Sequence, residues 1–398
     1  MSANDERHRV TRLLERLIAV NTSNPPGNEA ALAQLLAGEL AASGLEVSLT
    51  DLGSGRANLA ARLRGKSERP AMLWLGHLDT VPVGVEAWQS DPFTATIKGG
   101  RLFGRGASDM KSGLAAMSVA AMCLASSGET LEQDLILYFT ADEEAGGLGV
   151  RRLLQEPWLK NVGRIVVGEP TNLNIGVCEK GALWLEFTTT GRTAHGSSPE
   201  LGHNAIRSMQ LLMNELSRLE LGGAAHPLLG RNTLSFGTIA GGVKVNLVPD
   251  QCRLTVDIRL TPESDYRELL ERVELALRRL SDAEAGFRAR FRIINYYPAV
   301  QTPTDAPVVQ AALAVGSQVL GRTPALVGVT YFTDAALVVS ETGLPAVILG
   351  PGDPAEAHGP DESLSLSSLH AAVAYYRALG RWAFDCCRLK NRPPSIPI

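Results

Sequence analysis

The sequence has few cysteines for its 398 residues, and none of them forms a C-x-x-C motif. There are five, an odd number, and they are scattered: Cys123, Cys178, Cys252, Cys386 and Cys387. Neither a disulfide framework nor a zinc site built on thiolates is therefore expected. This pattern favours a reduced protein of the cytoplasm.

Long apolar segments and charge of one dominant sign are also missing. The longest apolar run, Leu114–Ala125, is far shorter than the ~20 residues that span a bilayer. The polar N-terminal segment lacks the apolar region of a signal peptide. The net charge is only −4, without a block of like charges. Neither nucleic acid nor a membrane is therefore expected as a partner.

What is present is the composition of a globular protein, with 45% apolar and 20% charged residues. The length corresponds to two or three domains. The early part of the chain alternates between helical patterns (5–20, 29–43, 110–127, 148–156) and β-rich segments (46–52, 58–63, 71–78, 135–140, 164–167). Two of these segments, AMLWLGHL and LILYFT, are almost entirely apolar, which is typical of strands buried on both faces. The alternation predicts an α/β fold with a mixed, mostly parallel sheet flanked by helices.

The pattern changes near residue 183, where LWLEFTTT alternates between apolar and polar residues, as in a sheet with one face in water. Helices at 204–219 and 264–280 and strands at 233–239, 252–260 and 287–296 complete an α+β unit of two helices and four strands. After about residue 300 the α/β pattern returns, with helices at 306–320 and 367–385 and a strand at 346–349. We interpret residues 1–182 and 296–398 as one discontinuous domain, interrupted by an α+β domain of residues 183–295.

Five residues of the types that bind metals follow predicted strands or precede a helix: His77, Asp109, Glu144, Glu169 and His358. Open α/β sheets gather their ligands at the carboxyl ends of the strands. Two imidazoles and three carboxylates without a thiolate suit a hydrolytic pair of zinc ions, and cobalt or manganese fits the same ligands. Two such ions share charge best through one bridging carboxylate, ~3.5–4 Å apart. Glu143 is then left as a general base.

Each of these signals has a structural alternative when it is taken singly. His77 and Asp79 face the same side of a strand, which also fits a structural His–Asp pair. Asp109 stands where a helix N-cap is expected. The acidic run Asp142–Glu144 also fits a solvated turn, although acids beside an apolar strand are costly unless they are solvated or bind cations.

A Gly-rich loop, GRGASDMKSG, invites a nucleotide-binding interpretation. A phosphate-binding loop requires Gly before the Lys, but Met110 precedes Lys111 here. Asp109 occupies the last glycine position of a G-x-G-x-x-G motif and would repel phosphate. The loop therefore does not support a nucleotide-binding oxidoreductase.

At these residues the sequence resembles the M20 metallopeptidase family, which includes acetylornithine deacetylase, succinyl-diaminopimelate desuccinylase, aminoacylase-1 and glutamate carboxypeptidase. The resemblance covers essentially the whole chain, in the order GHLDTVP, GRGASDMKSG, ADEEAGG, GEPT and AHGPDE. It implies a zinc-peptidase-like catalytic domain that holds two zinc ions per subunit. The peptide bond after Asp109 is often cis in this family.

The resemblance also implies a role for each site residue. Asp109 would bridge the two metals. One metal would be completed by His77 and Glu169, and the other by Glu144 and His358. Glu143 would activate the bridging water, and Asp79 would orient His77.

Residues 183–295 then resemble the lid, or dimerisation, domain of the family, which implies a homodimer. His195 would reach the active site of the partner subunit and stabilise the developing oxyanion. Arg259 would pair with a substrate carboxylate in a bidentate geometry that Lys cannot copy. Asn246, Thr333 and Gly352 fall in segments that would line the substrate.

The resulting hypothesis is a dinuclear zinc hydrolase that cleaves an N-acyl amino acid or a related small amide carrying a carboxylate, as deacetylases and desuccinylases do. The first alternative is a carboxypeptidase or dipeptidase of the same family, which also needs a substrate carboxylate. A catalytically silent metal-binding scaffold is disfavoured, because Glu143 and every ligand position are filled.

Overall fold

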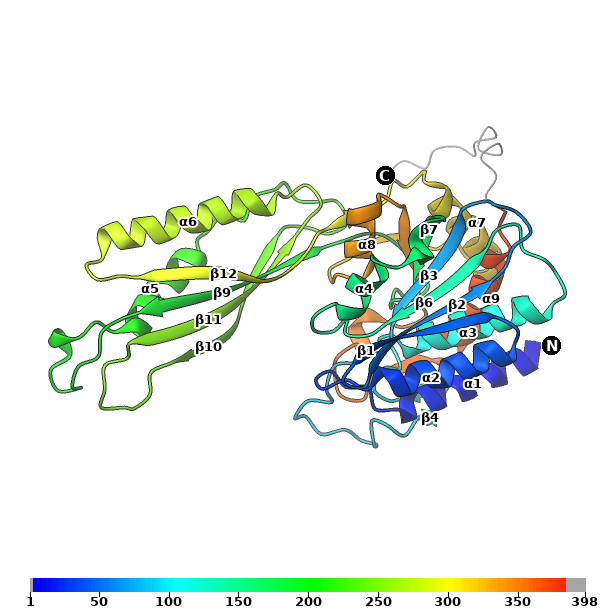
Figure 1. The fold of residues 1–398 in the computed structure, drawn as a ribbon, viewed down its shortest axis with the longest axis horizontal. Coiled ribbons are helices and arrows are strands. Elements are labelled where there is room, and N and C mark those ends of the chain that lie inside the picture. Colours follow the sequence, from blue (N-terminus) through cyan, green and yellow to red (C-terminus); the bar gives the residue numbers. More distant parts are fainter. Residues whose placement is uncertain (1–2, 384–398) are drawn as a thin grey trace. The chain divides into compact units, whose positions relative to one another are not determined.

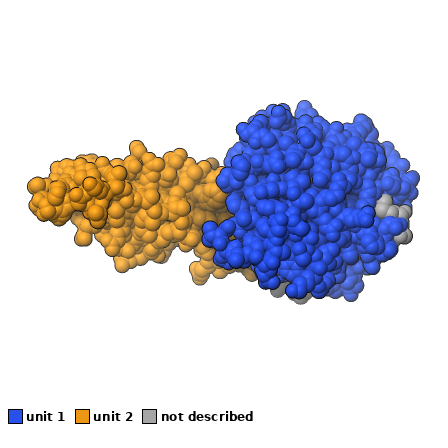
Figure 2. All heavy atoms as spheres, turned by 90° about the horizontal axis from the view of Figure 1, so that it is seen from below, with its two compact units in different colours: residues 1–177, 302–327, 333–398 blue, residues 178–301, 328–332 orange. Residues whose placement is uncertain are grey.

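The computed structural model describes residues 3–383. Cys386, Cys387 and the last residues of the helix expected over 367–385 lie outside this range. The described chain forms two compact units, which Figure 2 colours separately. Unit 2 contains Cys178–Gln301 and Gly328–Phe332, and unit 1 contains the other described residues.

The largest sheet has nine strands. They are β1 (Glu46–Gly53), β2 (Arg56–Leu63), β3 (Ala71–His77), β6 (Leu135–Thr140), β7 (Val162–Val167), β8 (Ile175–Glu179), β13 (Val300–Gln301), β14 (Leu326–Val329) and β15 (Ala346–Ile348). Their order is β1-β2-β6-β3-β7-β15-β8-β13, and β14 pairs with β8. Figure 1 labels β1, β2, β3, β6 and β7 of this sheet. The central strands β6, β3, β7 and β15 run parallel, whereas the pairs towards both edges are antiparallel. The prediction of a mixed, mostly parallel sheet flanked by helices is confirmed.

Helices surround this sheet. They are α1 (Ala3–Ala19), α2 (Glu29–Ala42), α3 (Lys111–Ser126), α4 (Leu148–Leu153), α7 (Pro307–Leu320), α8 (Ala335–Thr342) and α9 (Leu366–Gly380), with short 3-10 turns at Pro157–Leu159 and Pro354–Glu356. Helix α3 packs between α1 and α9, α7 packs on α9, and α2 covers β1 and β2. Every residue of β3 and β6 is buried, as their apolar sequences predict.

A small second sheet in unit 1 has the order β16-β5-β4. Its strands β4 (Thr96–Lys98), β5 (Arg101–Phe103) and β16 (Ser363–Ser365) have three residues each. Such short strands carry no periodicity, so the sequence does not predict them. The pairing of β16 with β5 joins the segment after His358 to the segment before Asp109.

Unit 2 is an α+β sandwich of one sheet and two helices. Its antiparallel sheet has the order β10 (Thr233–Gly241), β11 (Gln251–Leu260), β9 (Gly181–Thr190), β12 (Ala289–Tyr297). The helices are α5 (Ala205–Leu216) and α6 (Tyr266–Ala283), preceded by a 3-10 turn at Pro199–Leu201. Buried and more exposed residues alternate along β11, and the buried set packs in the same apolar cluster as Met209 of α5 and Val273 of α6. This is the two-helix, four-strand unit that the sequence predicts.

The cysteines within the described range, Cys123, Cys178 and Cys252, are free and buried. None of the helices in residues 3–383 is both long and apolar enough to cross a bilayer.

Candidate metal centre

The five predicted ligands converge at one edge of the parallel part of the large sheet. His77 is the last residue of β3, Glu144 follows β6, and Glu169 follows β7. Because these three strands are parallel neighbours, their carboxyl ends meet. Asp109 stands two residues before α3, and His358 lies on the connection from β15 to β16.

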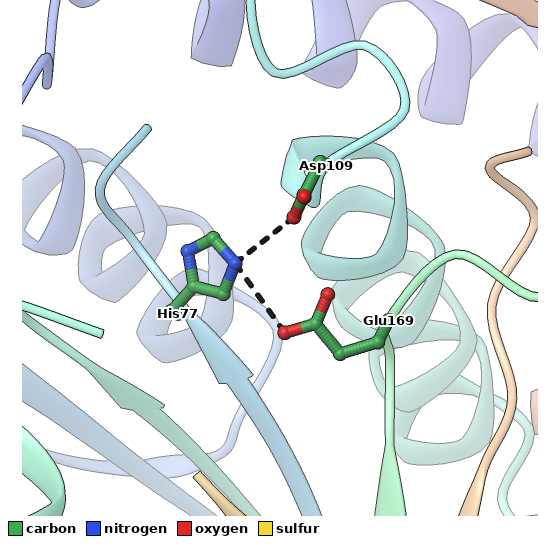
Figure 3. Close-up of side chains that lie close together, drawn as sticks. All are labelled: His77, Asp109 and Glu169. Atoms are coloured by element: carbon green, nitrogen blue, oxygen red, sulfur yellow. Dashed lines mark hydrogen bonds and ion pairs between the residues drawn. The ribbon is translucent and has the colours of Figure 1, made fainter. Parts of the chain in front are cut away.

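Asp109 lies between the two histidines. Its Oδ1 is 3.1 Å from His77 Nε2, and its Oδ2 is 3.2 Å from His358 Nε2. Oε1 of Glu169 is 3.4 Å from His77 Nε2, and Figure 3 shows these side chains pointing towards one another. Oε2 of Glu144 is 3.5 Å from His358 Nε2. Two groups of three ligands result, which share Asp109, and within each group the ligand atoms lie within 4.8 Å of one another.

These spacings suit metal ions. Bonds of 2.0–2.2 Å to a tetrahedral ion place neighbouring ligand atoms about 3.3–3.6 Å apart. Imidazole nitrogen and carboxylate oxygen are the donors of catalytic zinc sites. Oε1 of Glu144 is buried and has no hydrogen-bond partner within the described part of the chain, which fits an oxygen that serves a cation.

The carboxyl groups of this cluster are strongly perturbed. Burial raises the pKa of Glu143, Glu144 and Glu169 above the usual glutamate range. Burial acts in the same direction on Asp109, but hydrogen bonds from the two histidines outweigh it and hold the pKa of Asp109 below its usual range. When all four are ionised, these carboxylates carry enough negative charge to balance two divalent cations.

The histidines are perturbed by the same neighbours. Hydrogen bonds to Asp109 and Glu144 raise the pKa of His358 to about 10. Burial acts to lower the pKa of His77, but the charges of Glu169 and Asp109 outweigh it and raise that pKa well above its usual range. The raised pKa of His358 favours its protonated ring at neutral pH, and a cation bound there would have to displace that proton.

Glu143 stands beside the candidate ligand Glu144 and is 6% exposed. The backbone N–H groups of Glu143 and Glu144 both donate to the carboxylate of Asp79, at 3.1 Å each. Nδ1 of His77 lies 3.0 Å from the carbonyl oxygen of Asp79 and 3.7 Å from its carboxylate. The carboxylate of Asp79 therefore holds the turn that carries Glu143, a contact that the sequence does not reveal.

The loop before Asp109 is folded around the buried carboxylate of Glu362, to which the sequence assigns no role. Its Oε1 accepts the backbone N–H groups of Ser108 and Asp109, at 2.7 and 2.8 Å. Its Oε2 accepts the N–H of Gly106 at 2.9 Å and the guanidinium of Arg105 at 2.8 Å. A phosphate would need these N–H groups, so their use by a carboxylate argues further against nucleotide binding.

The segment after Asp109 is anchored on α1. The peptide bond between Asp109 and Met110 is cis, as the family resemblance implies. Nζ of the buried Lys111 donates to the carbonyl oxygens of Leu17 and Val20 at the end of α1, at 2.9 and 2.7 Å. Burial lowers the pKa of Lys111 to about 7.

Two of the predicted substrate-lining residues, Thr333 and Gly352, belong to unit 1. Thr333 is buried, and its Oγ1 accepts the N–H of Ala335 at the start of α8. A Cβ on Gly352 would lie 2.4 Å from the carbonyl oxygen of Ser108. Only glycine therefore lets this loop approach the segment next to Asp109.

His195 and Asn246 lie side by side on exposed segments of unit 2. The N–H of Gly196 donates to the carbonyl oxygen of Asn246 at 2.9 Å, and His195 forms a β-bridge with Leu247. Nδ1 of His195 is 2.7 Å from Oγ of Ser197, which leaves Nε2 as the ring nitrogen facing away from this contact.

Arg259 belongs to a second cluster in unit 2, on β11. Its Nε donates to Asp257 at 3.1 Å, and its guanidinium lies 5.3 Å from the centre of the Phe332 ring. Asp257 also accepts the indole N–H of Trp184 at 3.1 Å. Asp257 and Phe332 thus orient the arginine head group within this unit.

Comparisons with known proteins agree with this geometry. A model described as "Peptidase family M20/M25/M40" matches residues 73–381. An acetylornithine deacetylase from Myxococcus xanthus is 32% identical over 369 residues, which cover 89% of this chain and 92% of that protein.

Two solved structures resemble the fold. An M20 family metallo-carboxypeptidase from Sulfolobus solfataricus has a TM-score of 0.80 at 19% identity, covering 94% of this chain and 98% of its own. A dinuclear metal binding peptidase of the M20 family from Bacillus subtilis has a TM-score of 0.73 at 18% identity, covering 95% and 98%. At these identities the two structures support the fold alone.

Proposed function

Because the chain belongs to the peptidase family M20/M25/M40, we propose that it is a dinuclear metal hydrolase that cleaves an N-acyl amino acid or a related small amide carrying a carboxylate. Membership of the family, which the motifs predict, is confirmed, and with it a hydrolase that acts on amide bonds. The observation that carries the proposal is the position of Asp109, with one oxygen on each histidine.

The ligands of the metal pair follow from this position. Asp109 would bridge, His77 and Glu169 would complete one site, and Glu144 and His358 would complete the other. When bound, two divalent cations supply Lewis acidity and make water a nucleophile at neutral pH. Zinc suits the nitrogen and oxygen donors, and cobalt or manganese would occupy the same ligands.

Glu143 is the proposed general base. It stands next to Glu144, a proposed ligand, and is buried, and burial raises its pKa above the usual glutamate range. Glu143 would take a proton from the attacking water. It would then give that proton to the nitrogen of the departing amine, so that the amide bond breaks into a carboxylate and an amine.

Further residues would bind the substrate. We propose that Arg259 binds the carboxylate of the substrate, because Asp257 and Phe332 already orient its guanidinium. His195 would stabilise the oxyanion in the active site of the partner subunit, within a homodimer formed through residues 183–295. Asn246, Thr333 and Gly352 would line the substrate.

A substrate panel tests this proposal. Metal-loaded protein is offered N-acetyl, N-succinyl and N-formyl amino acids, dipeptides and glutamate-terminated amides, each with and without a chelator. We expect chelator-sensitive release of an amino acid from one N-acyl group. Release from dipeptides or glutamate-terminated amides alone would replace the deacylase by a dipeptidase or carboxypeptidase. A protein that binds no metal and hydrolyses nothing would contradict the proposal and favour the scaffold.

A further inference from the structure

Asn24 is a buried polar residue from the start of the chain that reaches the turn carrying Glu143. It follows α1, in the segment NPPGNE, which the sequence pattern marks only as the end of a helix. The segment is fixed to the strand end beside His77. The backbone N–H of Asn24 donates to the carbonyl oxygen of Thr80 at 2.8 Å. The backbone N–H of Thr80 in turn donates to the carbonyl oxygen of Thr22 at 3.1 Å.

The side-chain amide of Asn24 joins three charged residues. Its Nδ2 donates to Oδ2 of Asp79 and to Oδ1 of Asp142, at 2.9 Å each. Its Oδ1 accepts from the guanidinium of Arg56 at 2.7 Å. Carboxylates only accept and a guanidinium only donates, so the amide has one possible orientation. Both N–H groups of the amide are in use.

Arg56, on β2, holds the other side of this network and is 13% exposed. Its Nη2, which donates to Oδ1 of Asn24, also donates to the carbonyl oxygen of Pro26 at 2.8 Å. Its Nη1 donates to Oε1 of Glu29 at 2.7 Å and to Oδ1 of Asp142 at 2.9 Å. One planar guanidinium thus donates hydrogen bonds to four partners, a geometry that the ammonium group of lysine cannot copy.

The two carboxylates bonded to Asn24 accept hydrogen bonds from backbone N–H groups at both ends of the turn between β6 and α4. Asp79 accepts the backbone N–H groups of Glu143 and Glu144. Asp142 has a left-handed backbone with φ of 70°, and its Oδ2 accepts the N–H of Leu148 at the start of α4, at 3.2 Å. The position of Glu143 is therefore set from a segment that lies far from it in the chain.

The network buries charged groups, which costs desolvation free energy. The carboxylates of Glu29 and Asp79 are buried and that of Asp142 is 13% exposed. Arg56 forms ion pairs with Glu29 and Asp142. Buried ionic groups pay a desolvation penalty, and apolar residues of similar size often stabilise a fold better. What the network offers instead is exact placement of a turn.

We propose that Asn24 and Arg56 are positioning residues for the reaction, which act on Glu143 through Asp79 and Asp142. The inference rests on the proposed function, in which Glu143 is the base. A base must lie within hydrogen-bond reach of its proton, and a misplacement of about 1 Å costs about 10²-fold in rate.

The decisive variant is Asn24→Asp. It is nearly isosteric and keeps an oxygen for Arg56, but it turns a second oxygen towards Asp79 and Asp142. The expected result is a fall in kcat of about 10–100-fold, with KM within about threefold of the unchanged protein. Two metals per chain and a cooperative thermal transition should remain. The matched control is Arg62→Ala, on the same strand, whose ion pair with Asp134 lies away from this network; its kcat should not change.

Several outcomes would overturn the inference. One is a folded Asn24→Asp protein whose kcat equals that of the control. Another is a loss of activity that disappears when rates are expressed per folded, metal-loaded chain. If Asn24→Asp does not fold, Arg56→Lys is measured instead and judged by the same criteria. This substitution keeps the positive charge but removes the planar guanidinium that donates to several partners. A wild-type protein that hydrolyses nothing in the substrate panel would instead contradict the proposed function.

Discussion

The carboxylate of Glu362 accepts the backbone N–H of Asp109 at 2.8 Å, and Glu362 itself stands four residues after His358. One buried side chain therefore links the loop that carries Asp109, the proposed bridging ligand, to the segment that carries His358, a proposed ligand of the second metal. Arg105 reinforces the link, because it pairs with Glu362 and also donates to the carbonyl oxygen of His358 at 3.3 Å.

This link predicts weaker metal binding in Glu362→Gln. Each oxygen of Glu362 accepts two hydrogen bonds, so the NH2 group of glutamine must face donors whichever way it is turned. Loss of such an outer partner typically costs about 10–100-fold in metal affinity. Competition with a chelating dye measures the change. Glu356→Gln is the control, since its carboxylate pairs with Arg101 at the surface, and equal affinities in the two variants would contradict the prediction.

Replacement of the proposed base should separate chemistry from metal binding. In Glu143→Gln we expect turnover to fall by about 10²–10⁴-fold while both metals stay bound, because a positioned base contributes that much to rate. Glu144→Gln should instead lose metal, since Glu144 faces His358. Metal analysis and steady-state kinetics on both variants measure this difference. Turnover retained by Glu143→Gln would exclude it as the base.

The metal-free protein should lose stability as the pH rises above 6.5. His358 has its pKa raised to about 10, and the pKa values of His77, Glu143 and Glu169 are also raised. A group with a raised folded pKa stabilises the fold below its unfolded pKa, and this contribution disappears as the pH passes the folded value. Bound cations would replace these protons. Thermal unfolding at pH 6, 7.5 and 9 should therefore show a steeper decline with a chelator than with metal, and parallel declines would contradict the assignment.

Two helical glycines should respond to alanine with opposite signs. In α3, a Cβ on Gly113 would lie 2.1 Å from the carbonyl oxygen of Gly168, next to Glu169, whereas nothing lies within 4 Å of such an atom on Gly38 in α2. Gly113→Ala should lower the free energy of unfolding by about 1–3 kcal/mol through overpacking. Gly38→Ala should raise it by about 0.5–1 kcal/mol. Denaturant titration of both variants provides the comparison, and a stabilised Gly113→Ala would contradict the close approach.

The proposed role of His195 across a dimer can be tested by mixing subunits. His195→Ala and Glu143→Gln should each have low kcat for different reasons. A mixed dimer would contain one site with an intact Glu143 served by an intact His195 of the other subunit. Activity of the refolded mixture well above that of either variant is the expected result. A mixture no more active than its parts would argue against His195 acting on the partner.

Much of the centre can be predicted from the sequence by itself. His77, Glu144 and Glu169 each follow an apolar segment, and such segments become central parallel strands whose carboxyl ends must share an edge. The alternation of helices and strands and the change of period near residue 183 define the class of fold in the same local way. The prediction of the fold class succeeds because hydrophobic periodicity is a property of neighbouring residues.

The tertiary structure alone decides which distant groups hold these proposed ligands in place. Glu362 binds N–H groups more than 250 residues earlier in the chain, and Asn24 reaches Asp142 across 118 positions. A carboxylate or an amide can bond many donors, and its local sequence does not specify which of them the fold will bring near. Local patterns therefore determine where the ligands stand along the chain, whereas the packing of α1, β2 and β16 around the sheet edge decides how precisely they are held.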